Sequence, residues 1–286
     1  MSAASHQGEP RYYVPAPSHW PLTGSVALLL LGMGAAFWMN SLGAGPWLVL
    51  AGFAVLLLMM VGWFGNVIGE SESHKYSPQV DASFRWGMSW FIFSEVMFFG
   101  AFFGALFYVR AISVPDLGSL ESKLVWPDYT PAWPTVGPYF REKFTPMGAF
   151  GIPLINTIIL LTSGATLTAA HHGLKLGHRG QLKLWLFLTI VLGFTFLGFQ
   201  AFEYYHAYHE YNLKLSTGVY GSTFFMLTGF HGAHVTIGAI MLSVMLGRSI
   251  AGHFDKHHHF AFEAAAWYWH FVDVVWLLLF VLVYWL

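Results

Sequence analysis

The chain has 286 residues, of which 56% are hydrophobic, 19% aromatic and only 9% charged, and its formal net charge is -1. This composition lies far from that of soluble globular proteins and indicates a membrane protein. Because there is no basic surplus, nucleic acid is excluded as a partner, and because there is no cysteine, any metal would need His, Asp or Glu ligands.

Seven apolar segments are each long enough to cross the hydrocarbon core, which takes a helix of about 20 residues. They cover residues 22–40, 47–68, 84–109, 149–171, 182–205, 218–247 and 264–286. Residues 1–19 are polar and rich in proline and do not resemble a secretory signal. Residues 1–21 are predicted to be a cytoplasmic segment. The distribution of lysine and arginine between the connections predicts a cytoplasmic N-terminus and a C-terminus on the outer side.

The connections divide the chain unevenly. We expect an N-terminal segment (1–21), a two-helix group (22–68), an inner loop with the third helix (69–109), a long outer loop (110–148) and a four-helix group (149–286). The outer loop contains WPDYTPAWPTVGPYF, and this density of proline and aromatic residues predicts an ordered cap rather than a flexible tether.

Glu95 is a charged residue in the third segment. It lies about eleven residues into the predicted helix, roughly 16 Å along its axis, and therefore near the middle of the bilayer. A charge at that depth costs several kcal/mol unless it is neutralised, paired or faces protein. We therefore expect a protonated or hydrogen-bonded carboxyl, in either a neutral contact between helices or a proton-linked role.

Polar residues also mark the fourth and fifth segments. His171 and His172 close the fourth segment, where contacts with the helix terminus or with lipid headgroups are expected. Gln200 and Glu203 lie near the outer end of the fifth segment, where water is expected to reach them and where they would anchor the helix at the interface.

His231 and His234 are three residues apart in the sixth segment, which places them on one helical face at about the depth of Glu95. A metal pair is compatible with that spacing, although packing and hydrogen bonding explain it more simply. Nearby glycines would allow a neighbouring helix or a lipid chain to approach closely.

The seventh segment, AFEAAAWYWHFVDVVWLLLF, carries two adjacent stripes at helical spacing. One stripe is Glu263, Trp267 and His270, and the other is Trp269, Asp273 and Trp276. This broad face needs a cover of protein or lipid headgroups. The three histidines before it, His257 to His259, are expected to be solvated headgroup contacts.

Motifs along nearly the whole chain resemble subunit III of the aa3-type cytochrome c oxidases, in the haem-copper oxidase superfamily. The matching stretches are WPLTGS, SEVMFF, INTIILLTSGATLTAAHH, QAFEYY, STGVYGSTFFMLTGFHGAHV and HHFAFEAAAWYWHFVDVVWLLLF. The resemblance implies an all-α membrane protein with seven transmembrane helices. It also implies that helices one and two are separated from helices three to seven by a V-shaped, lipid-binding cleft.

The resemblance further implies a redox-inert accessory core subunit of a complex that passes electrons from cytochrome c to O2 in aerobic respiration and pumps protons. Such a subunit stabilises subunit I, binds structural phospholipid, supports proton uptake and offers O2 a route inward. No catalytic residue, metal or cofactor is expected in this chain. Haem a, haem a3 and copper belong to subunits I and II, cytochrome c binds elsewhere on the complex, and a small extra subunit is an optional partner.

Individual residues are assigned by their position in the matching motifs. Glu95 takes the place of the family's carbodiimide-reactive glutamate. Residues expected at the lipid sites or the cleft are His231, His234, Arg248, His253, Phe254, Glu263 and Trp267. Residues expected at polar helix interfaces are His171, His172, Gln200, Glu203, His270 and Asp273. The long loop 110–148, and Thr217 where the mitochondrial motif carries an acid, favour a bacterial plasma membrane over the mitochondrial inner membrane.

The sequence argues against three other classes of membrane protein. A membrane di-iron hydroxylase or desaturase needs about eight imidazoles at one depth, whereas the histidines here fall at several depths. A proton-coupled transporter that uses Glu95 would need broken helices around a midplane site, and the segments here are continuous. A quinol-oxidising relative usually lacks the first two helices.

Overall fold

The computed structural model describes residues 13–139, 143–256 and 258–286, which contain helices and no strand. The helical elements are α1 (Trp20–Met39), α2 (Gly45–Glu72), α3 (Pro78–Phe107), η1 (Tyr108–Ser113), α4 (Val114–Asp116), α5 (Leu120–Val125), α6 (Ile152–Leu176), α7 (Arg179–His209), α8 (Gly218–Ala251), α9 (Phe260–Leu279) and η2 (Phe280–Trp285). Within the described ranges, seven helices are long and apolar enough to cross a membrane. The predicted all-α fold with seven membrane-spanning helices is therefore confirmed.

Several helices are longer than the apolar segments that predicted them. Helix α7 has 31 residues, which corresponds to about 46 Å and exceeds the hydrocarbon thickness of about 30 Å. The third spanning helix runs without a break from Pro78 through the π-helical η1 to Asp116. The first seven residues of the predicted loop 110–148 are therefore helical, because hydropathy marks contact with hydrocarbon and not the last helical turn.

The rest of that loop is held against the helical bundle. Helix α5 begins at Ser119, whose side chain accepts a hydrogen bond from the Ser122 amide. The backbone amide of Tyr220, at the start of α8, donates to the carbonyl of Thr135 at 3.2 Å. These contacts support the predicted ordered cap, although residues 140–142 lie outside the described ranges and the side of the membrane stays a prediction.

Proline and glycine set the ends of several helices. A proline occupies the first turn of α1, α2 and α6, where its missing amide hydrogen is not needed. Helix α6 ends at Gly177 and α8 at Gly252, with left-handed φ angles of 77° and 87° that glycine adopts without a steric penalty.

The chain divides into two compact units, with the boundary between Phe84 and Arg85. In the first unit, α1 and α2 approach closely at glycines. A Cβ on Gly34 would lie 2.6 Å from the Val49 amide nitrogen of α2, and one on Gly52 would lie 2.8 Å from the backbone of α1. The hairpin is therefore packed backbone to backbone. The cleft expected between the two helix groups stays a prediction.

The first unit also contains a half-buried phenol in the connection after α2. The hydroxyl of Tyr76 donates to the carboxylate of Glu70 at 2.9 Å, and its ring contacts Tyr13 and Phe84 edge to face. Burial and this hydrogen bond raise the pKa of Tyr76 above its ordinary value. The contact ties the connection back to the end of α2.

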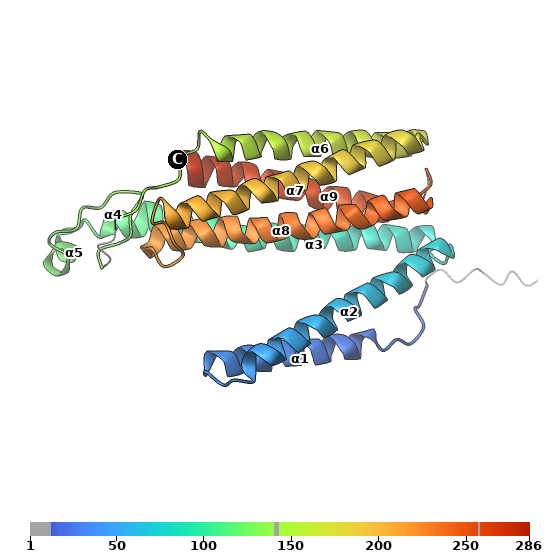
Figure 1. Cartoon of the computed structure of the whole chain (residues 1–286), viewed down its shortest axis with the longest axis horizontal. Helices are drawn as coiled ribbons and strands as arrows, with labels where there is room; N and C mark the ends of the chain where they lie inside the picture. The colour runs from blue at the N-terminus through green and yellow to red at the C-terminus, as the bar shows by residue number, and fades with distance from the viewer. Residues whose placement is uncertain (1–12, 140–142, 257) are drawn as a thin grey trace, which may run out of the picture. The chain divides into compact units, whose positions relative to one another are not determined.

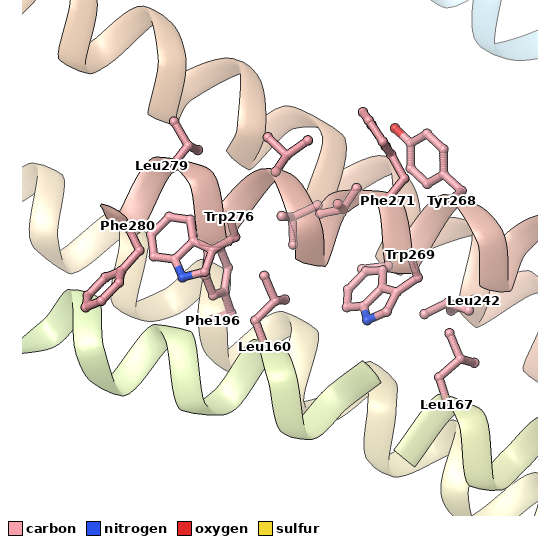
Figure 2. Packing of buried hydrophobic residues seen from close by; sticks show 14 of the residues in the cluster. Leu160, Leu167, Phe196, Leu242, Tyr268, Trp269, Phe271, Trp276, Leu279 and Phe280 are labelled. Carbon is pink, nitrogen blue, oxygen red and sulfur yellow. The ribbon is translucent and has the colours of Figure 1, made fainter. Parts of the chain in front are cut away.

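In the second unit, α9 forms the centre of the bundle made with α6, α7 and α8 (Figure 1). Trp269 and Trp276 of α9 are fully buried. Figure 2 shows both indoles directed from α9 toward α6. There the indole nitrogen of Trp269 donates to the hydroxyl of Ser163, and that of Trp276 to the hydroxyl of Thr157, each at 2.9 Å. Two hydrogen bonds thus fix α9 along α6.

Small residues make room for the Trp269 ring. A Cβ on Gly193 of α7 would lie 2.7 Å from the ring, and one on Gly238 of α8 would lie 2.8 Å from it. The predicted close approach of a neighbouring helix is confirmed at Gly238, whereas a Cβ on Gly232 would meet nothing within 4 Å. The Trp269 indole therefore occupies space that only the absence of a side chain at Gly193 and Gly238 leaves free.

Candidate functional site

Glu95 of α3 and His234 of α8 form a hydrogen-bonded pair. The imidazole Nε2 lies 2.9 Å from the Glu95 carboxyl, and Nδ1 lies 2.7 Å from the Phe230 carbonyl. Because a carbonyl can only accept, Nδ1 carries a proton. The bond between Nε2 and Glu95 then needs one further proton, held either by the carboxyl or by the ring. The pair is neutral overall in both forms, as a half-buried site among apolar helices requires.

His231 has a different environment from His234. It is fully buried, and its ring packs against Trp276 in a tilted arrangement and against Phe196 edge to face, with centroid distances of 5.1 and 5.7 Å. Neither ring nitrogen has a hydrogen-bond partner within the described ranges. The metal-pair interpretation of these two histidines therefore gains no support, since one packs among aromatic rings and the other binds Glu95.

A second polar cluster lies where α6 ends and α9 begins. The Glu263 carboxylate accepts a hydrogen bond from Arg85 of α3. Its other oxygen, Oε1, lies 3.6 Å from Nε2 of His171 and 3.2 Å from Nε2 of His259. Three helices and one connection therefore meet at a single carboxylate.

This cluster corrects one expectation. His259 was expected to be solvated, but it is only 8% exposed, because it folds back over the first turn of α9 onto Glu263. His258 is exposed as expected, and it binds Asp255. His257 lies outside the described residues. Of the two histidines that close the fourth segment, His171 faces the cluster and His172 is exposed.

The polar-aromatic face of α9 is divided in two. Trp269, Asp273 and Trp276 are buried inside the second unit, and a Cβ on Gly164 of α6 would lie 2.4 Å from the Asp273 carboxyl. His270 Nδ1 lies 3.5 Å from that carboxyl, while its side chain is 45% exposed. Trp267 is 37% exposed. The chain itself therefore covers one stripe, and the other stripe is partly open.

Gln200 and Glu203 of α7 lie deeper than predicted. Their exposed fractions are 5% and 0%, because the α7 face that carries them turns into the bundle. The expectation that water reaches them is wrong for the folded chain. Within ranges 13–139, 143–256 and 258–286, their side-chain oxygen and nitrogen atoms have no hydrogen-bond partner.

Arg248, His253 and Phe254 come together at the end of α8. The Arg248 guanidinium lies 4.6 Å from the centroid of the Phe254 ring, and the His253 amide donates to the Arg248 carbonyl at 3.0 Å. Phe254 also lines a cavity of about 210 Å³ whose wall includes Arg179 and Lys256. The wall also includes one acid, Asp255, so its charged side chains are positive by one charge. A pocket with an aromatic wall and this excess of cations suits an anionic group.

Two partners of Glu263, His259 and Arg85, were not predicted from the sequence. The spacing of His259 and Glu263, four residues apart, could have indicated that they share a helical face. Arg85 was used only to predict topology, and nothing in a single sequence indicates that it meets a residue 178 positions later. Ser163 and Thr157, whose hydroxyls accept hydrogen bonds from Trp269 and Trp276, were likewise not predicted as partners. The sequence showed them only as members of a matching motif.

The described histidines are scattered: some lie at Glu95, at Glu263 or among aromatic rings, and others lie beside Glu210, Asp255 or Asp273. A di-iron centre of about eight imidazoles therefore does not fit the described part of the chain. The spanning helices of the described ranges are continuous at Glu95, which also argues against a transporter built from broken helices.

Comparison with known proteins gives a consistent result. A family model described as "Cytochrome c oxidase subunit III" matches residues 10–286. The chain is 44% identical over 283 residues to "Cytochrome c oxidase subunit 3" of Scyliorhinus canicula, and 45% identical to the proteins with that name from Carassius auratus and Squalus acanthias. Each alignment covers 98% of both chains.

Proposed function

The chain belongs to the cytochrome c oxidase subunit III family, and it is therefore a subunit of an oxidoreductase complex. We propose that it is the redox-inert accessory core subunit of an aa3-type oxidase. In this proposal the complex passes electrons from cytochrome c to O2 and pumps protons. Haem a, haem a3 and copper are held by subunits I and II. The observation that carries the proposal is the match along 98% of the chain.

The polar groups of the chain support a role without electron transfer. The sequence has no cysteine, and the histidines that lie inside the bundle bind carboxyls or pack on aromatic rings. Such contacts hold helices together. We therefore propose that the polar residues of the helix interfaces hold the helices of this chain together; they are His171, His172, Gln200, Glu203, His270 and Asp273.

Glu95 is proposed to be the proton-linked group of the chain. Its pairing with His234 leaves one proton shared between a carboxyl and an imidazole. A carbodiimide reacts with a carboxyl that holds a proton, and the form of this pair in which Glu95 carries the shared proton provides one. This geometry supports the role in proton uptake that the family resemblance implies.

Phospholipid is proposed to bind at two places. At the end of α8, Arg248, His253 and Phe254 lie beside the cavity lined by Arg179 and Lys256, which suits a phosphate headgroup. Along α8 and α9, the open stripe with Trp267 offers an aromatic surface to acyl chains. His231, His234 and Glu263 would border these lipid sites, and a lipid-filled path would give O2 a way inward.

The chain is a multi-pass membrane protein by its seven apolar helices. We propose a bacterial plasma membrane, a cytoplasmic N-terminus and a periplasmic C-terminus, supported by the distribution of basic residues and by Thr217 in place of the acid of the mitochondrial motif.

The test is a pull-down of the tagged chain in a gentle detergent, with iron, copper and haem measured before and after a harsher detergent removes the partners. We expect haem a and copper to co-elute at first and to leave with the partners. An untagged preparation is the control. If non-haem iron stays on the stripped chain, or if haem a never co-elutes, the proposal is wrong.

A further inference from the structure

The cluster of His171, His259 and Glu263 combines three metal-binding side chains from two parts of the second unit. His171 lies near the end of α6, His259 directly precedes α9, and Glu263 lies in the first turn of α9. One ligand atom from each residue lies within 4.8 Å of the other two. Nothing in the proposed function uses this convergence.

The orientation of His259 is informative. Its Nδ1 lies 3.0 Å from the backbone carbonyl of Asp255, which can only accept a hydrogen bond, so Nδ1 carries the ring proton. In the neutral ring, Nε2 then presents a lone pair to Oε1 of Glu263, 3.2 Å away. Two acceptors that face each other need a cation or a proton between them.

The second imidazole repeats this pattern. Nε2 of His171 is buried and lies 3.6 Å from the same Glu263 oxygen. Within the described part of the chain, neither Nε2 of His171 nor Nε2 of His259 has a hydrogen-bond partner of normal geometry. Two buried nitrogen atoms and one carboxylate oxygen thus converge without bonding to one another.

We propose that His171, His259 and Glu263 form a binding site for a divalent transition-metal ion, for which zinc is the best fit. Ligand atoms about 2.0–2.2 Å from a tetrahedral zinc ion lie about 3.4 Å from each other. The separations of Glu263 Oε1 from the two imidazole nitrogens, 3.2 and 3.6 Å, bracket that value. Water would complete the coordination at a fourth position.

The surroundings hold the ligands in the required orientation. Arg85 donates to Oε2 of Glu263, which leaves Oε1 directed at the imidazoles. The Asp255 carbonyl fixes the ring of His259. Metal-binding histidines and carboxylates usually have such outer partners, which set the tautomer and the ring plane. The site departs from the expectation that this chain binds no metal.

A proton is the alternative occupant. If His259 were an imidazolium ion paired with Glu263, the same residues would converge without a metal. The two cases differ in zinc content and in the atoms around zinc, so both quantities are measured.

The first experiment measures zinc per tagged chain after the chain, in its gently solubilised membrane complex, is incubated with zinc chloride and passed over a desalting column. Compared with wild type, His259→Gln is expected to lose about one zinc ion per chain. His172→Gln is the matched control, because His172 is the exposed neighbour of His171 and should keep the wild-type content. Since zinc is counted per tagged chain, the result does not depend on whether haem co-elutes.

The second experiment is zinc K-edge X-ray absorption of the same samples. The difference between wild type and His259→Gln should contain imidazole scattering and a light oxygen ligand. If His259→Gln does not assemble, His171→Asn takes its place in both measurements. Equal zinc content in wild type and variant, or zinc without imidazole scattering, overturns the proposal and assigns the cluster to a protonated ion pair.

Discussion

Gly238→Ala is predicted to destabilise the packing of α8 on α9. The added Cβ would lie 2.8 Å from the Trp269 ring, a distance at which one of the two must move. The ring has little freedom to do so, because it is fully buried, donates a hydrogen bond to Ser163 and meets Gly193 on its other edge. The helix backbones must therefore separate.

The magnitude follows from a matched pair of variants. Overpacking a well-packed core costs about 1–3 kcal/mol, while replacing glycine by alanine in a helix gains up to about 1 kcal/mol. Gly232→Ala in the same helix gains the same propensity term without a contact, since nothing lies within 4 Å. The propensity term cancels between the two variants, so Gly238→Ala should be less stable than Gly232→Ala by about 1–3 kcal/mol, or roughly 5- to 150-fold in the folded-to-unfolded ratio.

Pulse proteolysis of the tagged chain in its solubilised complex, across a series of SDS concentrations, measures that ratio. Trp269→Phe removes the ring atoms that the new methyl group would meet. In that background, Gly238→Ala should cost less than it does in the wild type, by an interaction energy of about 0.5–3 kcal/mol. Equal transition midpoints for Gly238→Ala and Gly232→Ala would refute the steric argument.

Three further outcomes are expected. A carbodiimide should label the wild-type chain, and Glu95→Gln should abolish the labelling seen by mass spectrometry; a label that persists elsewhere would displace the assignment. Trp276→Phe and Thr157→Val each remove one partner of a buried hydrogen bond, worth about 0.5–1.5 kcal/mol net, so the double variant should cost less than the sum of the two in the same proteolysis assay. The pKa of Tyr76 is raised in the folded chain, so its contribution to the free energy of unfolding is complete below its ordinary pKa of about 10 and is lost as pH rises through the folded pKa. Tyr76→Phe should therefore flatten the alkaline part of the curve of stability against pH. An unchanged curve would contradict this.

The number of spans and the depth of the polar residues could be predicted from the sequence. A hydrophobic run is a local property, and the position of Glu95 and His234 within their runs placed both near the same depth. The structure pairs them at 2.9 Å. Depth alone does not predict the angular position of a side chain around its helix axis. That position decides that His234 contacts Glu95 while His231 packs against Trp276.

The lateral arrangement of helices was beyond sequence-based inference. Glu203 was expected near water because it lies close to a helix end, but the face of α7 that carries it turns inward. The contact of Arg85 with Glu263 joins the third and seventh spanning helices. Such pairs depend on which helices are neighbours, and hydropathy does not contain that information.

The central position of α9 also has a consequence for biosynthesis. Of the spanning helices in the described ranges, α9 emerges last from the ribosome, yet α6 and α8 pack against it and Trp269 and Trp276 fill their shared interior. Until α9 is inserted, the hydroxyls of Ser163 and Thr157 have no indole to bind and the glycine faces of α7 and α8 have no ring to enclose. The earlier helices can enter the bilayer one by one, but their final register has to wait for the last one. A nascent chain arrested before residue 260 would therefore have helices that are inserted in the bilayer but not yet packed in their final register. Membrane quality control would act on the chain in that unpacked state.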